Sequence, residues 1–327
     1  RIRGEKAQNL EDAIACYRNA LTIYTPQAVP LECWKAGYNL GNLGFQQGNW
    51  QLAIEGYSQA VDAVKLTRSW ARTDERRQQI LEESIGIYHN LAQAYLNTNQ
   101  LQKAWETVES SKARNLVERL ANRDLQPKGN VPSSLLERLG ELRRRLPSLQ
   151  RELQLASSQE SRYSQLPLEQ RQQWQQDIQQ QIQQTQQEFE EVLDQIQPYD
   201  ASFRLTQEVP SMAFEEVQQV INQHTALIEW YITSERIIAF IVTHKNTQPF
   251  VWQSSADKQK ALVDGINDYL NSYYQEKRSQ WQQQLPDNFN QLVKVLHLDE
   301  LLAQIPSECN QLILVPHWFL HLFPLHA

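Results

Sequence analysis

The sequence predicts a mainly α-helical chain with three parts in order: a solenoid of stacked helical repeats, an antiparallel helical hairpin, and the beginning of an α/β domain. Three observations lead to this prediction. Alanine and tyrosine recur in a pattern in the first third, apolar residues recur at helical spacing in the middle third, and strand-like segments appear only in the last third. We place the three parts at residues 1–121, 135–198 and 199–327, with a linker over residues 122–134.

A repeated motif predicts pairs of packed helices in the first third. Three stretches, beginning at Asn9, Asn49 and Gln100, align with one another, and partner helices near Trp34 and Ile85 precede two of them. The aligned positions are Ala13, Ala53 and Ala104, then Tyr17, Tyr57 and Val108, then Ala20, Ala60 and Ser111. Residues at this spacing share one helix face, and the small ones allow a neighbouring helix to come close.

These stretches resemble the tetratricopeptide repeat, whose unit of 34 residues reads large-x2-Leu-Gly-x2-Tyr and then Ala-x3-Phe/Tyr-x2-Ala. The matching positions are Leu40, Gly41, Ala53, Tyr57 and Ala60 in the second unit, and Tyr88, Leu91, Ala92, Tyr95 and Ala104 in the third. The sequence departs from the pattern at Gly37 and Gly44, where larger residues are usual. The units are also longer than 34 residues, so we expect helix extensions or long loops around Tyr24–Cys33 and Leu66–Glu83.

The resemblance implies a protein or peptide partner, bound in a groove on the exposed face of the inner helices. In this register, that face carries Lys35, Tyr38, Asn42, Phe45, His89, Gln93 and Leu96. Aromatic and amide side chains suit an extended peptide or a helix. Nothing in the sequence identifies the partner or the oligomeric state.

Two apolar stripes predict an antiparallel coiled-coil hairpin in the middle third. The stripes step by three or four residues and comprise Leu136, Leu139, Leu142, Leu146, Leu149 and Leu153, then Ile178, Ile182, Thr185, Phe189, Val192 and Ile196. Pro147 should kink or break the first helix. The glutamine-rich second helix has an alternative interpretation as a low-complexity, aggregation-prone segment, but its regular stripe favours a solvated helix face.

The last third begins a sheet. Two segments rich in β-branched and aromatic residues, from Thr225 and from Arg236, predict a hairpin. A third strand near Phe250 should lie at an edge because of Pro249, and residues 310–316 should form a buried strand. We expect helices over residues 211–223, 257–285 and 288–305, with Ser211 and Asp257 as caps of the first two.

Two stretches resemble proteins of the CHAT family, in which a caspase-like domain follows tetratricopeptide repeats. Residues 312–327, "LILVPHWFLHLFPLHA", resemble the first core strand and turn of that domain, which reads "LilvPhg-Lh-lPfhAL". Residues 104–121 resemble the family's last repeat helix, with its E-x2-KAR-x-L run, at Glu109, Lys112, Ala113, Arg114 and Leu116.

The CHAT resemblance implies a cysteine peptidase with a His–Cys dyad, in which the histidine activates or positions the thiolate. In that family both dyad residues follow the core strand, so no catalytic residue carries over to this chain, which should be inactive by itself. Two functions stay open for the whole protein. It is either a peptidase regulated by its repeats or a non-catalytic adaptor, and the sequence does not identify a substrate.

We expect no metal and no cofactor. His317 and His321 have a ligand-like spacing, but Pro316 and Pro324 oppose a regular helix there, and no carboxylate or thiol stands nearby. These histidines should satisfy backbone groups or pack in a turn. Three scattered cysteines, Cys16, Cys33 and Cys309, fit no disulfide framework, and we expect each to be a buried small side chain in a reducing compartment.

The composition narrows the partners and the location. The 327 residues carry a formal net charge of −7, which argues against nucleic-acid binding. No apolar run reaches the ~18 residues of a membrane span, and no signal-peptide pattern is present, so we expect a cytoplasmic protein. Because the only methionine is Met212, we also expect the chain to begin inside a longer protein that has further repeats. At the C-terminal end of the chain, we expect the sheet to be incomplete.

Overall fold

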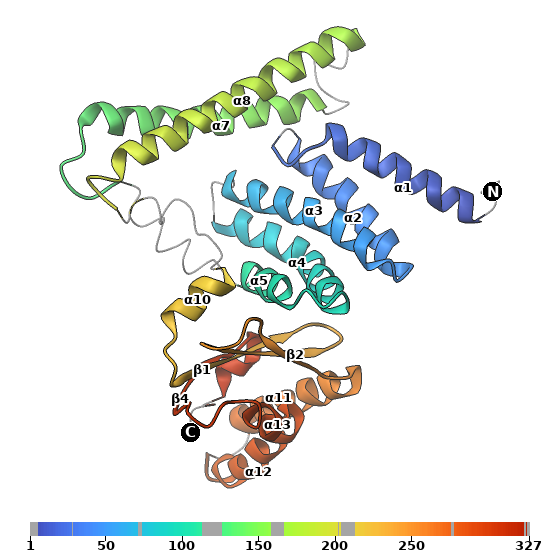
Figure 1. Ribbon diagram of the computed structural model, residues 1–327, viewed down its shortest axis with the longest axis vertical. Helices are drawn as coiled ribbons and strands as arrows, with labels where there is room; N and C mark the ends of the chain where they lie inside the picture. The colour runs from blue at the N-terminus through green and yellow to red at the C-terminus, as the bar shows by residue number, and fades with distance from the viewer. Residues whose placement is uncertain are drawn as a thin grey trace. The chain divides into compact units, whose positions relative to one another are not determined.

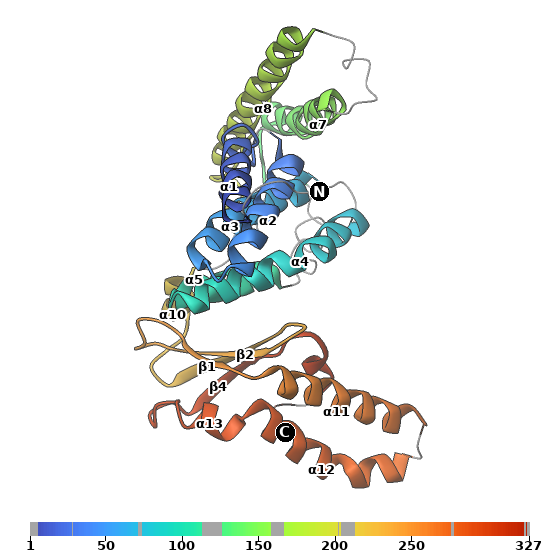
Figure 2. The ribbon, with the colours of Figure 1, turned by 90° about the vertical axis from the view of Figure 1, so that its right-hand side faces the viewer.

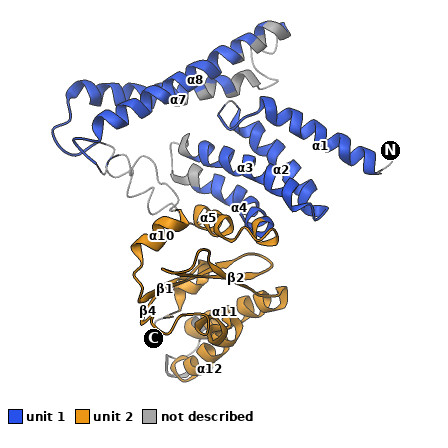
Figure 3. Ribbon diagram, viewed as in Figure 1, with its two compact units in different colours: residues 1–94, 113–210 blue, residues 95–112, 211–327 orange. Residues whose placement is uncertain are grey.

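The computed structural model describes residues 6–27, 29–70, 74–112, 126–157, 167–201, 203, 213–275, 278–323 and 325. The chain is mainly helical, with a four-stranded sheet toward its C-terminal end (Figure 1). Contacts divide it into two compact units (Figure 3): unit 1 comprises residues 1–94 and 113–210, and unit 2 comprises residues 95–112 and 211–327. The helix expected to close the third repeat therefore groups with the sheet.

The first helices of unit 1, where the sequence predicts repeats, pack through small residues. Its helices are α1 (Lys6–Ile23), α2 (Pro30–Gln46), α3 (Trp50–Trp70) and α4 (Asp74–Asn97), whose last three residues belong to unit 2. A Cβ on Gly37 would lie 2.7 Å from the carbonyl oxygen of Gly56, and a Cβ on Gly44 would lie 2.4 Å from the amide nitrogen of Ala53. The two glycines that depart from the repeat pattern thus allow α2 to touch the backbone of α3.

The predicted core positions of the second unit are buried. Leu40, Ala53, Tyr57 and Ala60 are all inaccessible to solvent. The extra length of the third unit lies in helix extensions and not in a long loop, because α3 continues to Trp70 and α4 starts at Asp74. The connection before α2 is also short, since α2 begins at Pro30.

Two long helices form the predicted hairpin, α7 (Ser133–Ser157) and α8 (Leu168–Ile196). The end of α7 packs on the start of α8, so the pair is antiparallel. The contacts are those of Leu149 and Leu153 with Ile178 and Ile182, and of Leu139 and Leu142 with Val192, Leu193 and Ile196. Of the kink or break predicted at Pro147, the break was wrong: α7 continues through this position, and buried Leu142 and Leu149 hold it against α8 on either side.

Unit 2 contains a mixed sheet with the strand order β3-β2-β1-β4. The strands β1 (Thr225–Ile232) and β2 (Ile237–Thr243) form the predicted antiparallel hairpin, and β3 (Phe250–Gln253) is the expected edge strand. β4 (Gln311–Val315) runs parallel to β1. The expectation that β4 is buried was wrong, because it lies at an edge of the described sheet and leaves Leu312 46% and Ile313 43% exposed.

Helices cover both faces of this sheet (Figure 2). On one face lie α5 (Leu101–Ser111) and α10 (Phe214–Val220). On the other lie α11 (Ala256–Gln275), α12 (Arg278–Leu296) and α13 (Leu298–Leu302), which enclose an apolar core with alternate residues of β1 and β2. Because both faces are covered, every residue of β1 and β2 is buried, including the glutamate at position 229.

Two helix predictions of the last third need correction. Residues 257–285 are not one helix, since α11 ends at Gln275 and α12 begins at Arg278. Asp257 does not cap α11 but lies in its first turn, because the helix already begins at Ala256. The predicted cap Ser211 lies outside the described residues, and α10 begins only at Phe214.

Candidate functional site

The predicted binding residues on α2 form a partly exposed surface. Tyr38 is 41% exposed, and its ring centroid lies 6.5 Å from that of Tyr57. Phe45 is half-buried and packs edge-on against Trp50, with 5.3 Å between the ring centroids. Lys35 is exposed and pairs with Glu32 of its own helix at 2.9 Å, so its ammonium group is available for exchange with a partner's carboxylate.

A buried tyrosine joins α2 to α4 beneath this surface. The hydroxyl of Tyr57 donates to Oδ1 of Asn42 at 2.6 Å and accepts from Nδ2 of Asn90 at 3.0 Å. Burial raises the pKa of Tyr57 to about 12, so the hydroxyl keeps its proton at neutral pH. The relay Asn42–Tyr57–Asn90 fixes both amides. The amide nitrogen of Asn42 and the amide oxygen of Asn90 take no part in these two hydrogen bonds.

The predicted residues on α4 are less exposed than those on α2. His89 and Gln93 are half-buried, and burial lowers the pKa of His89 to about 4, so its ring is neutral at physiological pH. Leu96 is buried, with only 8% of its surface exposed, and it falls within unit 2, so it does not present a side chain to a partner. Sequence reasoning missed Asn90, although a core tyrosine needs a polar partner for its hydroxyl.

A second arrangement of polar groups, which the sequence did not reveal, surrounds Glu229 on β1. This carboxyl group is 1% exposed, yet both of its oxygens accept hydrogen bonds from the segment that carries α5. The indole Nε1 of Trp105 donates to Oε2 at 2.5 Å, and the ammonium of Lys112 donates to Oε1. We call Trp105, Glu109, Lys112 and Glu229 the Glu229 cluster.

Burial controls the electrostatics of the Glu229 cluster. It raises the pKa of Glu229 well above its ordinary value, while the Lys112 ammonium opposes the shift and Glu109 adds to it. Lys112 is 15% exposed and also lies 3.5 Å from Oε1 of Glu109, which is 30% exposed. The ammonium therefore stands between a buried and a partly solvated carboxyl group.

A neutral polar chain continues along the same face of β1. Ser111 Oγ donates to the hydroxyl of Tyr231 at 2.8 Å, and the ring of Tyr231 lies 4.7 Å from that of His317. The amide of Ile232 donates to Nδ1 of His317 at 3.0 Å. This contact confirms that His317 satisfies a backbone group, whereas His321 is exposed at the end of the 3-10 helix Trp318–Leu322.

The cysteine prediction holds for one residue only. Cys33 is fully buried, and burial raises the pKa of its thiol to about 12, which makes it unreactive. Cys16 is exposed, because α1 packs on α2 along one side and leaves its outer face in solvent, and Cys309 is partly exposed. Within the described ranges, no group of three or more histidine, cysteine or acidic side chains is placed to hold a metal ion.

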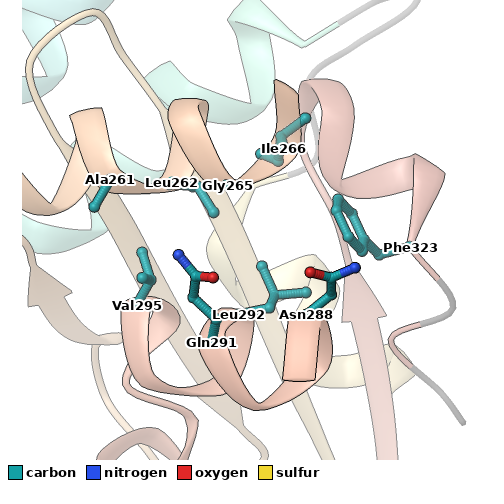
Figure 4. Close-up of a pocket in the computed structure, with 9 residues that line it drawn as sticks. All are labelled: Ala261, Leu262, Gly265, Ile266, Asn288, Gln291, Leu292, Val295 and Phe323. Carbon is teal, nitrogen blue, oxygen red and sulfur yellow. The ribbon is translucent and has the colours of Figure 1, made fainter. Parts of the chain in front are cut away.

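A small hollow lies between α11 and α12 of unit 2 and includes no residue of the Glu229 cluster. It measures about 20 Å³, room for one water molecule. Figure 4 shows Gln291 reaching from α12 toward α11, between the apolar side chains of Val295 and Leu292. A space of this size leaves no room for an organic ligand.

Comparisons with known proteins returned no match: neither a family model, nor a curated protein, nor a solved structure is similar to this chain at a significant level. In the part of the chain that the structure describes, no helix combines the length and apolar composition needed to cross a bilayer.

Proposed function

We propose that the chain is the protein-interaction region of a tetratricopeptide-repeat protein of the CHAT type, in which the inner helices bind a peptide or protein partner. In this proposal, unit 1 carries the repeats and the hairpin, and unit 2 is the first part of a caspase-like domain. The order of helices, hairpin and mixed sheet supports the assignment. So does the close packing of α2 on α3 through glycine and alanine.

One observation carries the binding role: an exposed tyrosine lies next to a buried tyrosine that fixes a pair of amides. Tyr38 is 41% exposed and offers apolar area, its ring centroid lies 6.5 Å from that of Tyr57, and the hydroxyl of Tyr57 holds the amides of Asn42 and Asn90. A rigid aromatic group contributes contact area at low cost in side-chain entropy, and ordered amides pair with the backbone of an extended peptide.

A peptide-display selection on the whole chain tests the binding role. Tyr38→Ala should lower the affinity for the selected peptides at least tenfold, equivalent to ~1.4 kcal/mol, because the variant removes the exposed ring and leaves the relay intact. Tyr199→Ala is the matched control, since Tyr199 is also exposed, at 47%, in unit 1. Equal loss in both variants, or a selection that enriches no peptide, would contradict the assignment.

The whole protein is, in this proposal, a cysteine peptidase regulated by partner binding to its repeats; a non-catalytic adaptor is the alternative. The resemblance to CHAT proteins places the His–Cys dyad outside these residues. Replacing the dyad cysteine by alanine in the full-length protein should abolish cleavage of a substrate if the peptidase assignment is correct. Persistent cleavage by that variant, or the absence of a histidine and a cysteine at the ends of two later strands, would favour the adaptor.

A further inference from the structure

The segment of residues 95–112 joins the two units through the chain itself. It is the part of unit 2 that comes from the first half of the sequence, and its two ends continue directly into unit 1 at Ala94 and Ala113. Within unit 2, side-chain contacts hold this segment on the sheet.

Glu229 holds this segment at two points. Trp105 and Lys112 are seven residues apart, about two helical turns, and so lie on one side of α5. They donate to different oxygens of the same carboxyl group, and Val108, fully buried between them, completes the contact face. One side chain on β1 thus binds the middle of α5, at Trp105, and the residue that follows the helix, Lys112.

Lys112, which directly follows α5, has an alternative partner on that helix. Its ammonium reaches Glu109 at 3.5 Å as well as Glu229, and Glu109 is far more accessible to water. When Glu229 takes up a proton, the ammonium keeps Glu109 within reach and is not left without a partner in a buried place. The arrangement accommodates both protonation states of Glu229 without a change of fold.

We propose that Glu109, Lys112 and Glu229 form a proton-sensitive latch that holds α5 on the sheet and loosens as the pH rises. In the docked state an ionised Glu229 is costly, because it is almost completely removed from water. In an opened state, with α5 displaced, the carboxylate faces water and ionises without this cost. The docked state therefore binds the proton more tightly, so acid closes the latch and base opens it.

The sign follows from linkage. The pKa of Glu229 in the docked state is raised above its ordinary value of 4.5, chiefly by burial. The stabilisation of docking is therefore fully present below pH 4.5 and is lost as the pH rises through the docked-state pKa. This inference concerns α5 and β1 alone and does not depend on which partner the repeats bind.

The other groups near Glu229 leave this assignment intact. Its neighbours in the sheet, Phe240 on β2 and Val315 on β4, do not titrate. On α10, Phe214 packs against Trp105, and the backbone amide of Phe214 donates to Glu106 of α5 at 3.3 Å. Tyr231, the next residue on the same face of β1, contacts His317, an ionisable side chain that the tests below include as a control.

Hydrogen exchange of the whole chain between pH 5 and 8 tests the latch. After division by the intrinsic exchange rate, the opening constant of α5 amides should rise with pH in the wild type, by at most tenfold per pH unit, the limit for one proton. Glu229→Gln should abolish this rise, because the amide cannot ionise. Lys112→Met should extend the rise to higher pH and increase opening at pH 8 at least tenfold, because the ionised carboxylate loses its ammonium.

Two controls separate the latch from general effects. Lys245→Met breaks an exposed ion pair of unit 2, with Glu308 at 2.6 Å, and should leave α5 unchanged within twofold. His317→Gln should keep the wild-type pH dependence. The latch is overturned if Glu229→Gln retains that dependence or if Lys112→Met matches Lys245→Met at pH 8. Should Glu229→Gln fail to fold, the comparison of the two lysine variants decides the question alone.

Discussion

At the scale of single residues, removal of the Tyr57 hydroxyl should have the clearest effect on stability of any single-atom change. Tyr57→Phe keeps the buried ring but leaves the amides of Asn42 and Asn90 without their shared partner. We expect the free energy of unfolding to fall by about 1–3 kcal/mol, the usual range for a buried hydrogen bond that is lost. Urea unfolding followed by circular dichroism measures this change.

Tyr38, an exposed tyrosine whose ring lies next to that of Tyr57, provides the control. Tyr38→Phe removes a hydroxyl from a ring that is 41% exposed and should change stability by less than about 0.5 kcal/mol. If Tyr57→Phe is equally neutral, the relay does not order the two amides, and the surface at Tyr38 loses the rigidity on which its binding role rests. Leu96 was wrongly predicted as a binding residue, because it is buried. The predicted register indicates which helix face a residue occupies, but packing decides whether that face is exposed to solvent.

At the scale of elements, the contact of α2 with α3 depends on glycine. A Cβ at Gly56 would lie 2.2 Å from the amide nitrogen of Gly41 and 2.6 Å from the carbonyl oxygen of Gly37. Gly56→Ala should therefore force the two helix backbones apart and destabilise unit 1 by about 1–3 kcal/mol. Thermal unfolding of the variant would show a lower midpoint.

Gly86 provides the matched comparison within α4. A Cβ there meets no atom within 4 Å, so Gly86→Ala should be neutral or stabilise the helix by up to about 1 kcal/mol. Two alanine substitutions with effects of opposite sign would separate backbone contact from helix propensity. Equal effects would mean that α2 and α3 adjust without loss and that the glycines are not required for close packing.

Elements with a regular period were predictable from the sequence, and long-range pairs were not. The stripe through Leu139 and Leu142 indicated the hairpin, because its partners on α8 repeat at the same spacing. Glu229 gave no such signal, since it lies among strand residues and its donor Trp105 is 124 positions away. The prediction that β4 is buried failed for a related reason. An apolar strand indicates burial on two faces, but its sequence does not show where the sheet ends.

At the scale of the whole molecule, the hairpin of unit 1 and the sheet of unit 2 each contain an apolar cluster of their own. In unit 1, Ile182 packs in the hairpin with Leu149, Leu153 and Ile178. In unit 2, Ile241 of β2 packs with residues of β1, α11 and α12. Because these buried clusters share no residue, a cavity in one should lower the stability of that unit without removing contacts from the other.

Hydrogen exchange on the whole chain tests this independence. Ile241→Ala should cost about 2–5 kcal/mol in unit 2 and increase exchange in β1, β2 and α11, while α2, α3 and α8 keep their protection. Ile182→Ala is the reciprocal variant and should act on α7 and α8 only. If either variant raised exchange equally in both units, they would unfold as one cooperative body. The Glu229 cluster would then not be a separable attachment of α5 but one part of a continuous core.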